Sequence, residues 1–419
     1  MIVGIIGSGG REHAICCKIR DSSKISKIFC IPGNAGTSYI AENVNIKVDD
    51  FKSIKEFCLI NKIELLIVGP EQPLVKGIVD YLSDTKIKVF GPNRIASQLE
   101  GSKIFTKKIC KKYQIPTANF EIFENLSDAK KFLSISKYPL VVKADGLAAG
   151  KGVYICKKFE EGFAAAEEIF GGKFGTTKYL LVEEFLKGEE MSYFVICDGK
   201  NYKFIGTAQD HKRVGEGDTG KNTGGMGCYS PSRLFSPKLA EKINTKIINP
   251  TLKAIAELGS EYVGFLYVGL MIKDNNPFLV EFNVRMGDPE CQTILPLLKN
   301  DLTEIFINCC LGNLKSEIKL IKKKSICIVL CAKGYPEDYK KNIHIKGLDK
   351  LILKDGEYIF HAGTNLKNKK ILVSGGRVLN FVSVSNNLKI SRNNLIKLIN
   401  NLGWDNGFFR KDIGYKVID

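Results

Sequence analysis

The chain has 419 residues, of which 44% are apolar and 26% are charged, and its formal net charge is +17 at pH 7. This composition is typical of a globular protein with several domains, and it excludes a disordered chain, a disulfide-stapled miniprotein and a fibrous repeat. The thirteen cysteines are never spaced C-x-x-C, so they predict buried thiols in a reducing compartment rather than a zinc site or a disulfide framework.

The N-terminus lacks the basic segment and the long apolar run of a signal peptide, and no uncharged apolar run reaches the roughly 18 residues that span a bilayer. We therefore expect a cytoplasmic protein without membrane contact. The positive charge would suit nucleic acid, but the lysines are spread along the chain and their clusters lack aromatic neighbours. We interpret these clusters as surface charge: Lys107-Lys108 with Lys111-Lys112, and Lys322 to Lys324.

The first hundred residues alternate short β-branched runs with helical stretches. Strands are predicted at 2–6, 27–31, 65–68 and 88–90, and helices at 12–19 and 53–61. Strands separated by helices predict a parallel α/β sheet with right-handed crossovers.

A glycine turn at residues 7–10 follows the first strand and precedes a helix. Glu12 stands where a dinucleotide fingerprint needs its third glycine, so that motif is broken. The free amides of the helix N-terminus, with Arg11 and His13 beside them, predict an anion site. A tight turn without a ligand is the alternative. Glu71, after the third strand, lies where open α/β sheets bind ligands, although a structural turn explains it equally well.

The middle of the chain begins with a helix at 103–114 and a strand-helix-strand pattern over 117–186. Further on, strands are predicted at 193–197, 267–272 and 277–284, and a helix at 238–258. A polar, glycine-rich stretch at 210–227 is too long for a linker and predicts a functional loop.

Lys143 lies on a strand that leads into a glycine-rich loop, residues 146–152, which carries Lys151. Loop amides and two lysine charges can neutralise a polyphosphate, although the loop is not a Walker A motif. Because the loop has few apolar anchors, we expect a mobile lid. A bare hairpin is the alternative.

The strand at 277–284 alternates polar and apolar side chains. Glu281, Asn283 and Arg285 share one side, because successive side chains of a strand alternate faces. The other side is apolar and consists of Val280, Phe282 and Val284. Carboxylate and amide oxygens suit Mg²⁺ beside nucleotide phosphates, and Arg285 can stabilise a phosphoryl group. An amphipathic edge strand is the alternative.

The acidic segment 183–190 predicts a hinge that reads adenine and ribose, with an acidic surface turn as the alternative. The last hundred residues change to closely spaced strands. These are predicted at 325–332, 358–361, 370–374 and 377–383, before a helix at 393–401. Gly375-Gly376 is predicted to form a hairpin turn.

Residues 143–153, 183–190 and 281–285 together resemble the ATP-grasp enzymes. Further stretches resemble the glycinamide ribonucleotide synthetase family of ATP-grasp ligases: 9–14, 69–74, 101–103, 210–213, 222–227, 287–290, 360–364 and 375–378. The chain departs from that family at Lys221, Cys228 and Met286, none of which is an expected ligand. The resemblance implies an ATP-grasp fold of the α/β class, with an N-terminal parallel α/β domain and a small C-terminal α+β domain. It implies domains at 1–102, 103–318 and 319–419, with a lid subdomain at about 117–188.

The resemblance implies ligation of glycine to 5-phosphoribosylamine by ATP, through a glycyl phosphate, in purine synthesis. Arg285 and Lys212 would be catalytic, and Glu281 and Asn283 would hold Mg²⁺ or Mn²⁺. ATP would bind Lys103, Lys143, Lys151, Glu183, Phe185, Leu186 and Glu190. The other substrates would bind Gly9, Gly10, Arg11, Glu71 and Asp210. The family further implies a monomer that takes small molecules and no nucleic acid.

Three other classes of protein stay open as alternatives. A biotin-dependent carboxylase component would share the nucleotide machinery but lack the segments 210–213 and 222–227. A nucleic-acid binder would explain the charge but leave Glu281, Asn283 and Arg285 without a role. A dinucleotide oxidoreductase would need the missing glycine at position 12.

Overall fold

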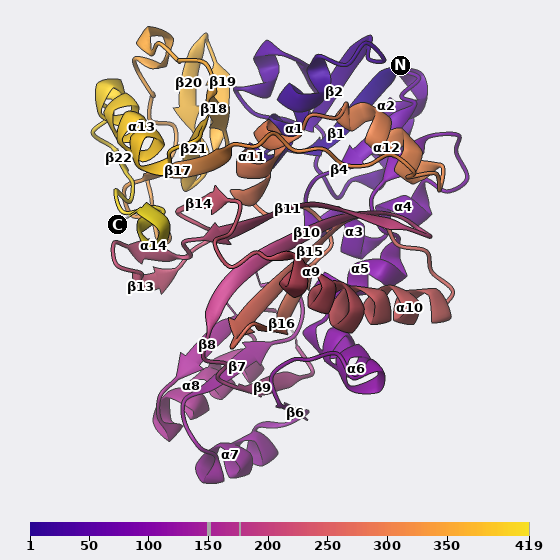
Figure 1. The fold of residues 1–419 in the computed structure, drawn as a ribbon, viewed down its shortest axis with the longest axis vertical. Helices are drawn as coiled ribbons and strands as arrows, with labels where there is room; N and C mark the ends of the chain where they lie inside the picture. The colour runs from indigo at the N-terminus through magenta and orange to yellow at the C-terminus, as the bar shows by residue number, and fades with distance from the viewer. Residues whose placement is uncertain (149–151, 176, 419) are drawn as a thin grey trace.

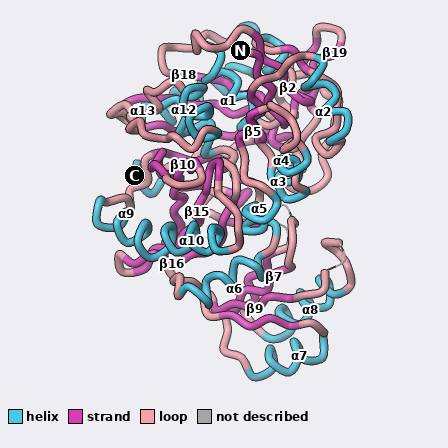
Figure 2. The backbone as a smooth tube through the Cα atoms, turned by 90° about the vertical axis from the view of Figure 1, so that its right-hand side faces the viewer, coloured by secondary structure: helices cyan, strands magenta, loops and turns pink. Residues whose placement is uncertain are grey.

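The structure is a computed structural model that describes residues 1–148, 152–175 and 177–418 (Figures 1 and 2). None of the described helices is long and apolar enough to cross a membrane. Three larger sheets organise the fold: a five-stranded sheet near the N-terminus, a four-stranded sheet at the bottom of Figure 1, and a nine-stranded sheet between them.

The first hundred residues form the predicted parallel α/β unit, with strand order β3-β2-β1-β4-β5. Its strands are β1 (Ile2–Gly7), β2 (Lys27–Pro32), β3 (Glu42–Asn43), β4 (Leu65–Val68) and β5 (Lys88–Phe90). Its helices are α1 (Gly10–Arg20), η1 (Thr37–Tyr39), α2 (Phe51–Ile60), α3 (Glu71–Lys76), α4 (Ile78–Tyr81) and α5 (Arg94–Gly101). β1 and β4 are neighbours and run in parallel, so their carboxyl ends bring the starts of α1 and α3 to one edge of the sheet.

The next segment forms a small antiparallel sheet with its own core, which hangs below the rest of the molecule in both views (Figures 1 and 2). The strand order is β6-β9-β7-β8. The elements are α6 (Lys103–Tyr113), β6 (Phe120–Phe123), α7 (Leu126–Ile135), β7 (Leu140–Ala144), β8 (Val153–Cys156), α8 (Phe159–Phe170) and β9 (Leu180–Glu184). α7 and α8 cover the sheet through Ala129, Leu133, Ala166 and Ile169, which are fully buried.

The nine-stranded sheet follows the order β16-β15-β10-β11-β14-β17-β21-β18, with β22 paired to β17. Its first half contains β10 (Glu189–Asp198), β11 (Tyr202–Asp210), β14 (Gly227–Ser230), β15 (Val263–Lys273) and β16 (Asn276–Asn283). Its second half contains β17 (Lys324–Ala332), β18 (Glu357–His361), β21 (Arg377–Ser385) and β22 (Gly407–Phe408). Because β14 pairs with β17, the sheet is continuous from the middle of the chain into its last hundred residues.

The remaining elements connect or cover this sheet. They are β12 (Arg213–Gly215), β13 (Thr219–Asn222), α9 (Pro237–Ile243), η2 (Asn244–Ile248), α10 (Asn249–Glu257), α11 (Glu290–Ile294), η3 (Leu295–Leu297), α12 (Leu302–Cys310), η4 (Leu348–Lys350), β19 (Thr364–Lys367), β20 (Lys370–Val373), α13 (Leu388–Leu402) and α14 (Tyr415–Ile418). The helix predicted at 238–258 is present, with the π-helical turn η2 in its middle. The loop predicted at 210–227 contains the two-stranded hairpin β12–β13.

The prediction of a hairpin turn at Gly375-Gly376 is wrong. β20 pairs with β19, and the turn between these two strands contains Asn368 and Lys369, whose φ angles are 50° and 59°. Two consecutive positive φ angles are the geometry of a type I′ hairpin turn, which asparagine tolerates. β21 instead pairs with β17 and β18, and Gly375 packs against the backbone of Gly363.

Candidate active site

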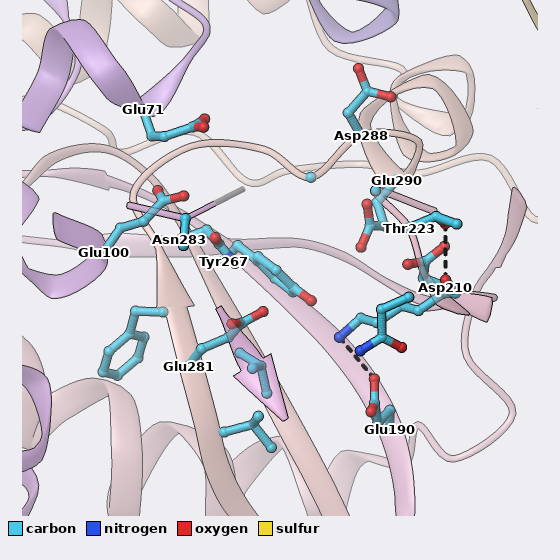
Figure 3. A pocket seen from close by; sticks show the side chains of 18 of the residues that line it. Glu71, Glu100, Glu190, Asp210, Thr223, Tyr267, Glu281, Asn283, Asp288 and Glu290 are labelled. Atoms are coloured by element: carbon cyan, nitrogen blue, oxygen red, sulfur yellow. Dashed lines mark hydrogen bonds and ion pairs between the residues drawn. The ribbon is translucent and has the colours of Figure 1, made fainter. Parts of the chain in front are cut away.

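A cavity of about 1230 Å³ lies where the three sheets meet. It is lined by fourteen of the residues expected to carry the chemistry: Gly9, Arg11, Glu71, Lys103, Lys143, Glu183, Phe185, Leu186, Glu190, Asp210, Lys212, Glu281, Asn283 and Arg285. Figure 3 shows several of them converging on one space from different elements. Side chains up to 214 residues apart in the chain are therefore neighbours in the fold.

Two expected site residues are not part of this lining. A Cβ at Gly10 would lie 2.3 Å from Asn380 Nδ2 and 2.5 Å from Gln292 Nε2, so Gly10 allows a close approach inside the protein. Lys151 falls in residues 149–151, outside the described part of the chain, and the lid expected at 146–152 includes these residues.

A buried carboxylate joins α6 to the four-stranded sheet. Glu183 Oε2 lies 2.8 Å from Lys143 Nζ, and Glu183 Oε1 lies 3.1 Å from Lys107 Nζ. Burial opposes the charge on Glu183, but the two ammonium groups hold its pKa below the ordinary value. Lys107 is only 3% exposed, so its interpretation as surface charge is wrong. Its spacing of four residues from Lys103 on a helix was the available signal for a shared face.

Lys103 lies at the start of α6 and connects that helix to the glycine-rich loop. Its Nζ donates a hydrogen bond of 2.9 Å to the carbonyl oxygen of Gly146. Asp145 accepts hydrogen bonds from the Ser102 hydroxyl and the Ile104 amide, which satisfies the helix N-terminus. Burial lowers the pKa of Lys103. The loop preceding β8 therefore starts from a fixed point beside the cleft.

A second ion pair lies on the opposite wall, at the start of β10. Lys212 Nζ is 2.9 Å from Glu190 Oε2, and this interaction lowers the pKa of Glu190 (Figure 3). The connection from β9 to β10 passes Phe185 and Leu186, both half-buried at the cleft. One end of the cavity is thus surrounded by the carboxylates of Glu183 and Glu190, the lysines Lys143 and Lys212, and the backbone of residues 185–186.

β16 presents Glu281 and Asn283 to the cleft, as the alternation predicts (Figure 3). The expected position of Val280 on the apolar side is wrong, because the pairing with β15 shifts between Gly269 and Leu270. This β-bulge leaves Val280 half-buried in the cleft lining next to Glu281. The other two apolar positions are buried as expected, with Phe282 2% and Val284 1% exposed, although Phe282 also borders the cavity.

Arg285 lies between two carboxylates of the N-terminal α/β unit. Its Nε is 3.0 Å from Glu71 Oε2, and its Nη2 is 2.6 Å from Glu100 Oε1. The same Nη2 donates to Asn283 Oδ1 at 3.2 Å. The arginine side chain is 18% exposed, so one edge of the guanidinium still reaches the cavity. Both carboxylates are fixed before any ligand enters.

The start of α1 faces the same cavity, but its amides already have partners. The Gly9 amide donates to Glu12 Oε2 at 2.7 Å, and the Arg11 amide donates to Asp288 Oδ2 at 3.3 Å. The Arg11 guanidinium pairs with Glu12 at 2.6 Å and donates to the carbonyl oxygen of Met286 at 3.1 Å. Carboxylate oxygens thus occupy the positions where an anion is expected to bind.

Two further carboxylates lie side by side in the cleft without a cation. Asp210 ends β11 and Glu290 begins α11, and neither forms an ion pair with a lysine or arginine of the described residues (Figure 3). Glu290 is 4% exposed and accepts a hydrogen bond from Ser192. Burial raises the pKa of both groups, and the nearby Glu290 carboxylate raises the pKa of Asp210 further. The pair favours a bound cation or a shared proton.

Four side chains that line the cleft carried no expected role: Glu100, Asp288, Glu290 and Arg377. Glu100 lies in a helix without a chemical motif, and no sequence signal pointed to it. Asp288, Glu290 and Arg377 occur in stretches that carried the family resemblance, which was the available signal. Arg377 Nη1 lies 3.2 Å from Asp288 Oδ1 and also donates to the carbonyl oxygen of Gly224 at 2.6 Å. This contact fixes the end of the 222–227 segment at the cleft.

Family models match the chain in three consecutive segments. Residues 1–100 match the N domain of phosphoribosylglycinamide synthetase, residues 101–291 match its ATP-grasp (A) domain, and residues 325–416 match its C domain. The first match covers the five-stranded sheet, the second covers the four-stranded sheet and the first half of the nine-stranded sheet, and the third covers its second half.

Individual proteins agree with these models. The phosphoribosylamine–glycine ligase of Brucella melitensis is 43% identical over all of this chain and 99% of its own length. The crystal structure of phosphoribosylamine–glycine ligase from Thermotoga maritima superposes with a TM-score of 0.86 at 31% identity, covering 99% of this chain and all of that one. A biotin carboxylase domain from Hydrogenobacter thermophilus, solved with MgADP, has a TM-score of 0.72 at 17% identity, covering 95% of this chain and 89% of that one. That last likeness shows the fold alone.

Proposed function

The chain belongs to the phosphoribosylglycinamide synthetase family, and from this premise we propose which residues of the cleft perform its reaction. It is an ATP-grasp ligase that joins glycine to 5-phosphoribosylamine in purine biosynthesis, with ATP as the energy source. The observation that carries the assignment is the convergence of fourteen expected residues, from three separate regions, on one cavity.

The reaction proceeds in two steps at this cavity. The carboxylate of glycine attacks the γ-phosphorus of ATP, and the bond to the β-phosphate oxygen breaks to release ADP and leave glycyl phosphate. The amine of 5-phosphoribosylamine then attacks the acyl carbon, loses a proton and expels inorganic phosphate. An anion attacks a polyanion in the first step, so the surrounding cations lower its barrier. No covalent enzyme intermediate is needed.

ATP lies between the four-stranded sheet and β16. Lys103 and Lys143 contact its phosphates, and Lys212 provides a further catalytic cation near the γ-phosphate. The backbone of Phe185 and Leu186 and the carboxylate of Glu183 read adenine, while Glu190 binds the ribose hydroxyls. The existing pairs Lys143–Glu183 and Lys212–Glu190 support this arrangement, since each lysine is held at the cleft before the nucleotide arrives. Lys151 joins the phosphate contacts from the loop.

Glu281 and Asn283 fit a divalent cation of the Mg²⁺ or Mn²⁺ type. Both offer hard oxygen donors to the cavity, and Glu281 forms no ion pair within the described residues. Two protein oxygens together with nucleotide phosphate oxygens are a sufficient set of ligands for Mg²⁺. When bound, the ion would neutralise charge on the β- and γ-phosphates. Arg285, held beside Asn283, stabilises the phosphoryl group in transfer.

Glycine and 5-phosphoribosylamine occupy the side of the cleft opposite the adenine. The ammonium group of glycine suits Asp210 and Glu290, which lack a cation in the described structure. The phosphate of 5-phosphoribosylamine suits Gly9 and Arg11, whereas the expected contact with Gly10 is not supported, because Gly10 lies outside the cavity lining. Glu71 reaches the ribose or amine of this substrate from the neighbouring strand end.

The remaining assignments concern the whole chain. We propose domains at 1–102, 103–318 (lid about 117–188) and 319–419, supported by three family models that match similar ranges. We propose a monomer that binds small molecules and no nucleic acid. Thirteen free thiols, most of them buried, support a reducing, cytoplasmic location.

Phosphate release from ATP tests the function. We expect rapid phosphate release only when glycine and 5-phosphoribosylamine are both present. With either substrate alone, the release should be much slower. Release that needs bicarbonate instead would favour a carboxylase-type reaction and contradict the proposal. Omission of divalent cation provides the control for the metal assignment.

A further inference from the structure

The last residues of the chain, 410–416, lie against the β12–β13 hairpin, and we name them the tail segment (Figure 1). Arg410 is the centre of this contact and is only 1% exposed. Its Nη1 donates to the carbonyl oxygen of Arg213 at 2.9 Å and to Asp218 Oδ1 at 2.8 Å. Its Nε and Nη2 form a two-point contact with Asp412 at 2.8 and 2.7 Å. One guanidinium therefore ties the tail segment to the start of β12 and to the turn between β12 and β13.

Further contacts between the two segments are polar and short. The Gly217 amide donates to Asp412 Oδ2 at 2.8 Å, and the Tyr415 hydroxyl donates to Asp218 Oδ2 at 2.9 Å. The Gly414 amide donates to His211 Nε2 at 3.1 Å, at the foot of the hairpin. The tail segment is itself fixed to the long sheet, because β22 just before it pairs with β17.

The hairpin has no core of its own. None of residues 213–222 is buried, and residues 219–222 of the strand β13 are all exposed. An isolated two-stranded hairpin is marginally stable at best in water. Val214, half-buried, packs on the core of the C-terminal region. The hydrogen-bonded contacts of Arg410 and Asp412 thus restrain the start and the turn of the hairpin, while the Lys221–Glu337 ion pair and the Arg377–Gly224 hydrogen bond restrain its other end.

The position of this hairpin matters for the cleft. Arg213, Asp218 and Asn222 line the cavity, and Lys212 immediately precedes β12. We propose that Arg410 is a positioning residue for the ligation: it holds the hairpin against the tail segment and so keeps Lys212 directed at the nucleotide phosphates. This inference rests on the proposed function of the cleft.

The chemistry of the contact explains why an arginine stands at position 410. A planar guanidinium can bind Asp412 at two points and still reach a carbonyl oxygen and a second carboxylate, whereas a lysine ammonium cannot cover this geometry. A buried ion cluster of this kind adds little to stability compared with an apolar substitute, but it fixes orientation. An orienting role beside a catalytic lysine accounts for its presence.

The test compares Arg410→Met, Arg410→Lys and the matched control Lys411→Ala in the full-length enzyme. Within the described residues, the hydrogen bond between Lys411 and the hairpin comes from its backbone amide, which donates to Glu216, and this bond survives the substitution. Two readouts are measured for each variant: steady-state kinetics, and amide hydrogen exchange over residues 213–222 with β17 and β21 as internal references.

For Arg410→Met we expect kcat to fall by about tenfold, as for loss of a charged hydrogen bond, while KM for 5-phosphoribosylamine stays within about twofold. Exchange should accelerate in 213–222 and stay unchanged in β17 and β21. The kcat and the exchange rates of Arg410→Lys should lie between those of Arg410→Met and the wild type. The same quantities in Lys411→Ala should match the wild type. Unchanged exchange in 213–222, or equal acceleration throughout β17 and β21, would overturn the positioning role. Exchange does not depend on activity, so the two failures are distinguishable: an inactive wild-type enzyme would overturn the proposed function, whereas unchanged exchange in Arg410→Met would overturn the role of Arg410 in holding the hairpin.

Discussion

Arg285 Nη2 lies 2.6 Å from Glu100 Oε1, so a buried carboxylate of the N-terminal α/β unit holds the arginine that follows β16. Glu100 also accepts a hydrogen bond of 2.8 Å from the Val284 amide through its other oxygen. Glu71 contacts the guanidinium from a second helix. The residue proposed to meet the transferring phosphoryl group is therefore oriented by a different domain from the one that binds the nucleotide.

Arg285 is held by the carboxylates of Glu71 and Glu100. Replacing Glu100 by Gln removes one of these two negative charges while preserving the shape of the side chain. Burial raises the pKa of Glu100 to about 7 against the pull of Arg285, so the carboxylate gains charge as the pH rises through neutrality. We expect kcat/KM of the wild type to increase across this range, and Glu100→Gln to lose about tenfold in kcat/KM at pH 8 together with this pH dependence. A pH profile of the two enzymes checks the prediction. A variant with the wild-type profile would contradict it.

Glu281→Ala tests the metal assignment. We expect kcat to fall by about 100-fold or more, because the substitution removes the charged ligand of an ion that contributes several kcal/mol to phosphoryl transfer. The fold should be retained, since the Glu281 side chain lines the cavity and makes no ion pair within the described residues. Activity is measured against Mg²⁺ concentration, with circular dichroism as the control for folding. Near-normal activity at millimolar Mg²⁺ would show that Glu281 is not a ligand.

The parts of the fold and site that follow a local rule could be predicted from the sequence. Continuous apolar runs predicted the buried parallel strands β1 and β4, and the period of two in β16 predicted a shared face for Glu281 and Asn283. Both patterns depend only on neighbouring residues in the chain.

The features that sequence reasoning missed depend on distant partners. The spacing of Lys107 from Lys103 indicates a shared helix face, but its burial follows only once Glu183, in another secondary-structure element, is placed beside it. Glu100 gains its role only from Arg285, which is 185 residues away. The bulge at Val280 is a property of the pairing between two strands and leaves no mark in one strand alone.

A buried histidine pair predicts loss of stability in acid. His13 Nδ1 accepts a hydrogen bond from the His361 amide at 2.8 Å, which joins the first and last regions of the chain. Burial, aided by the His361 and Arg20 charges, lowers the pKa of His13 to about 3, and burial lowers the pKa of His361 to about 4. In the unfolded chain both rings take up protons near pH 6.5, so the folded state loses stability as the pH falls from about 6.5 towards 4.

Each ring contributes up to about 1.4 kcal/mol per pH unit to this loss. His13→Asn keeps an acceptor for the His361 amide but removes one titrating group, and we expect it to lower the slope of unfolding free energy against pH by up to that amount. Urea unfolding between pH 5 and 7 measures the slope. His344→Asn, a histidine outside this pair, is the matched control. Equal slopes for the His13 variant and wild type would contradict the explanation.

The final prediction places 5-phosphoribosylamine at the start of α1. The nucleotide contacts assigned above leave the phosphate of 5-phosphoribosylamine without a binding site. The N-terminus of α1 favours an anion. The Gly9 and Arg11 amides donate to carboxylate oxygens of Glu12 and Asp288, so a phosphate that binds these amides has to displace those oxygens. Glu71, at the adjacent strand end, lies on the same side of the cleft.

We therefore expect Arg11→Ala to raise KM for 5-phosphoribosylamine by at least about tenfold, the cost of a charged hydrogen bond, with much smaller changes in KM for ATP and glycine. The competing explanation is structural, because the Arg11 guanidinium also binds Glu12 and the Met286 carbonyl oxygen. Loss of those contacts would displace the segment that leads from β16 to α11. The KM values for all three substrates would then rise together. Arg11→Lys separates the two cases: it keeps a cation for the phosphate but not the two-partner geometry. Recovery of KM for 5-phosphoribosylamine in Arg11→Lys supports a phosphate site, whereas a uniform loss in both variants contradicts it.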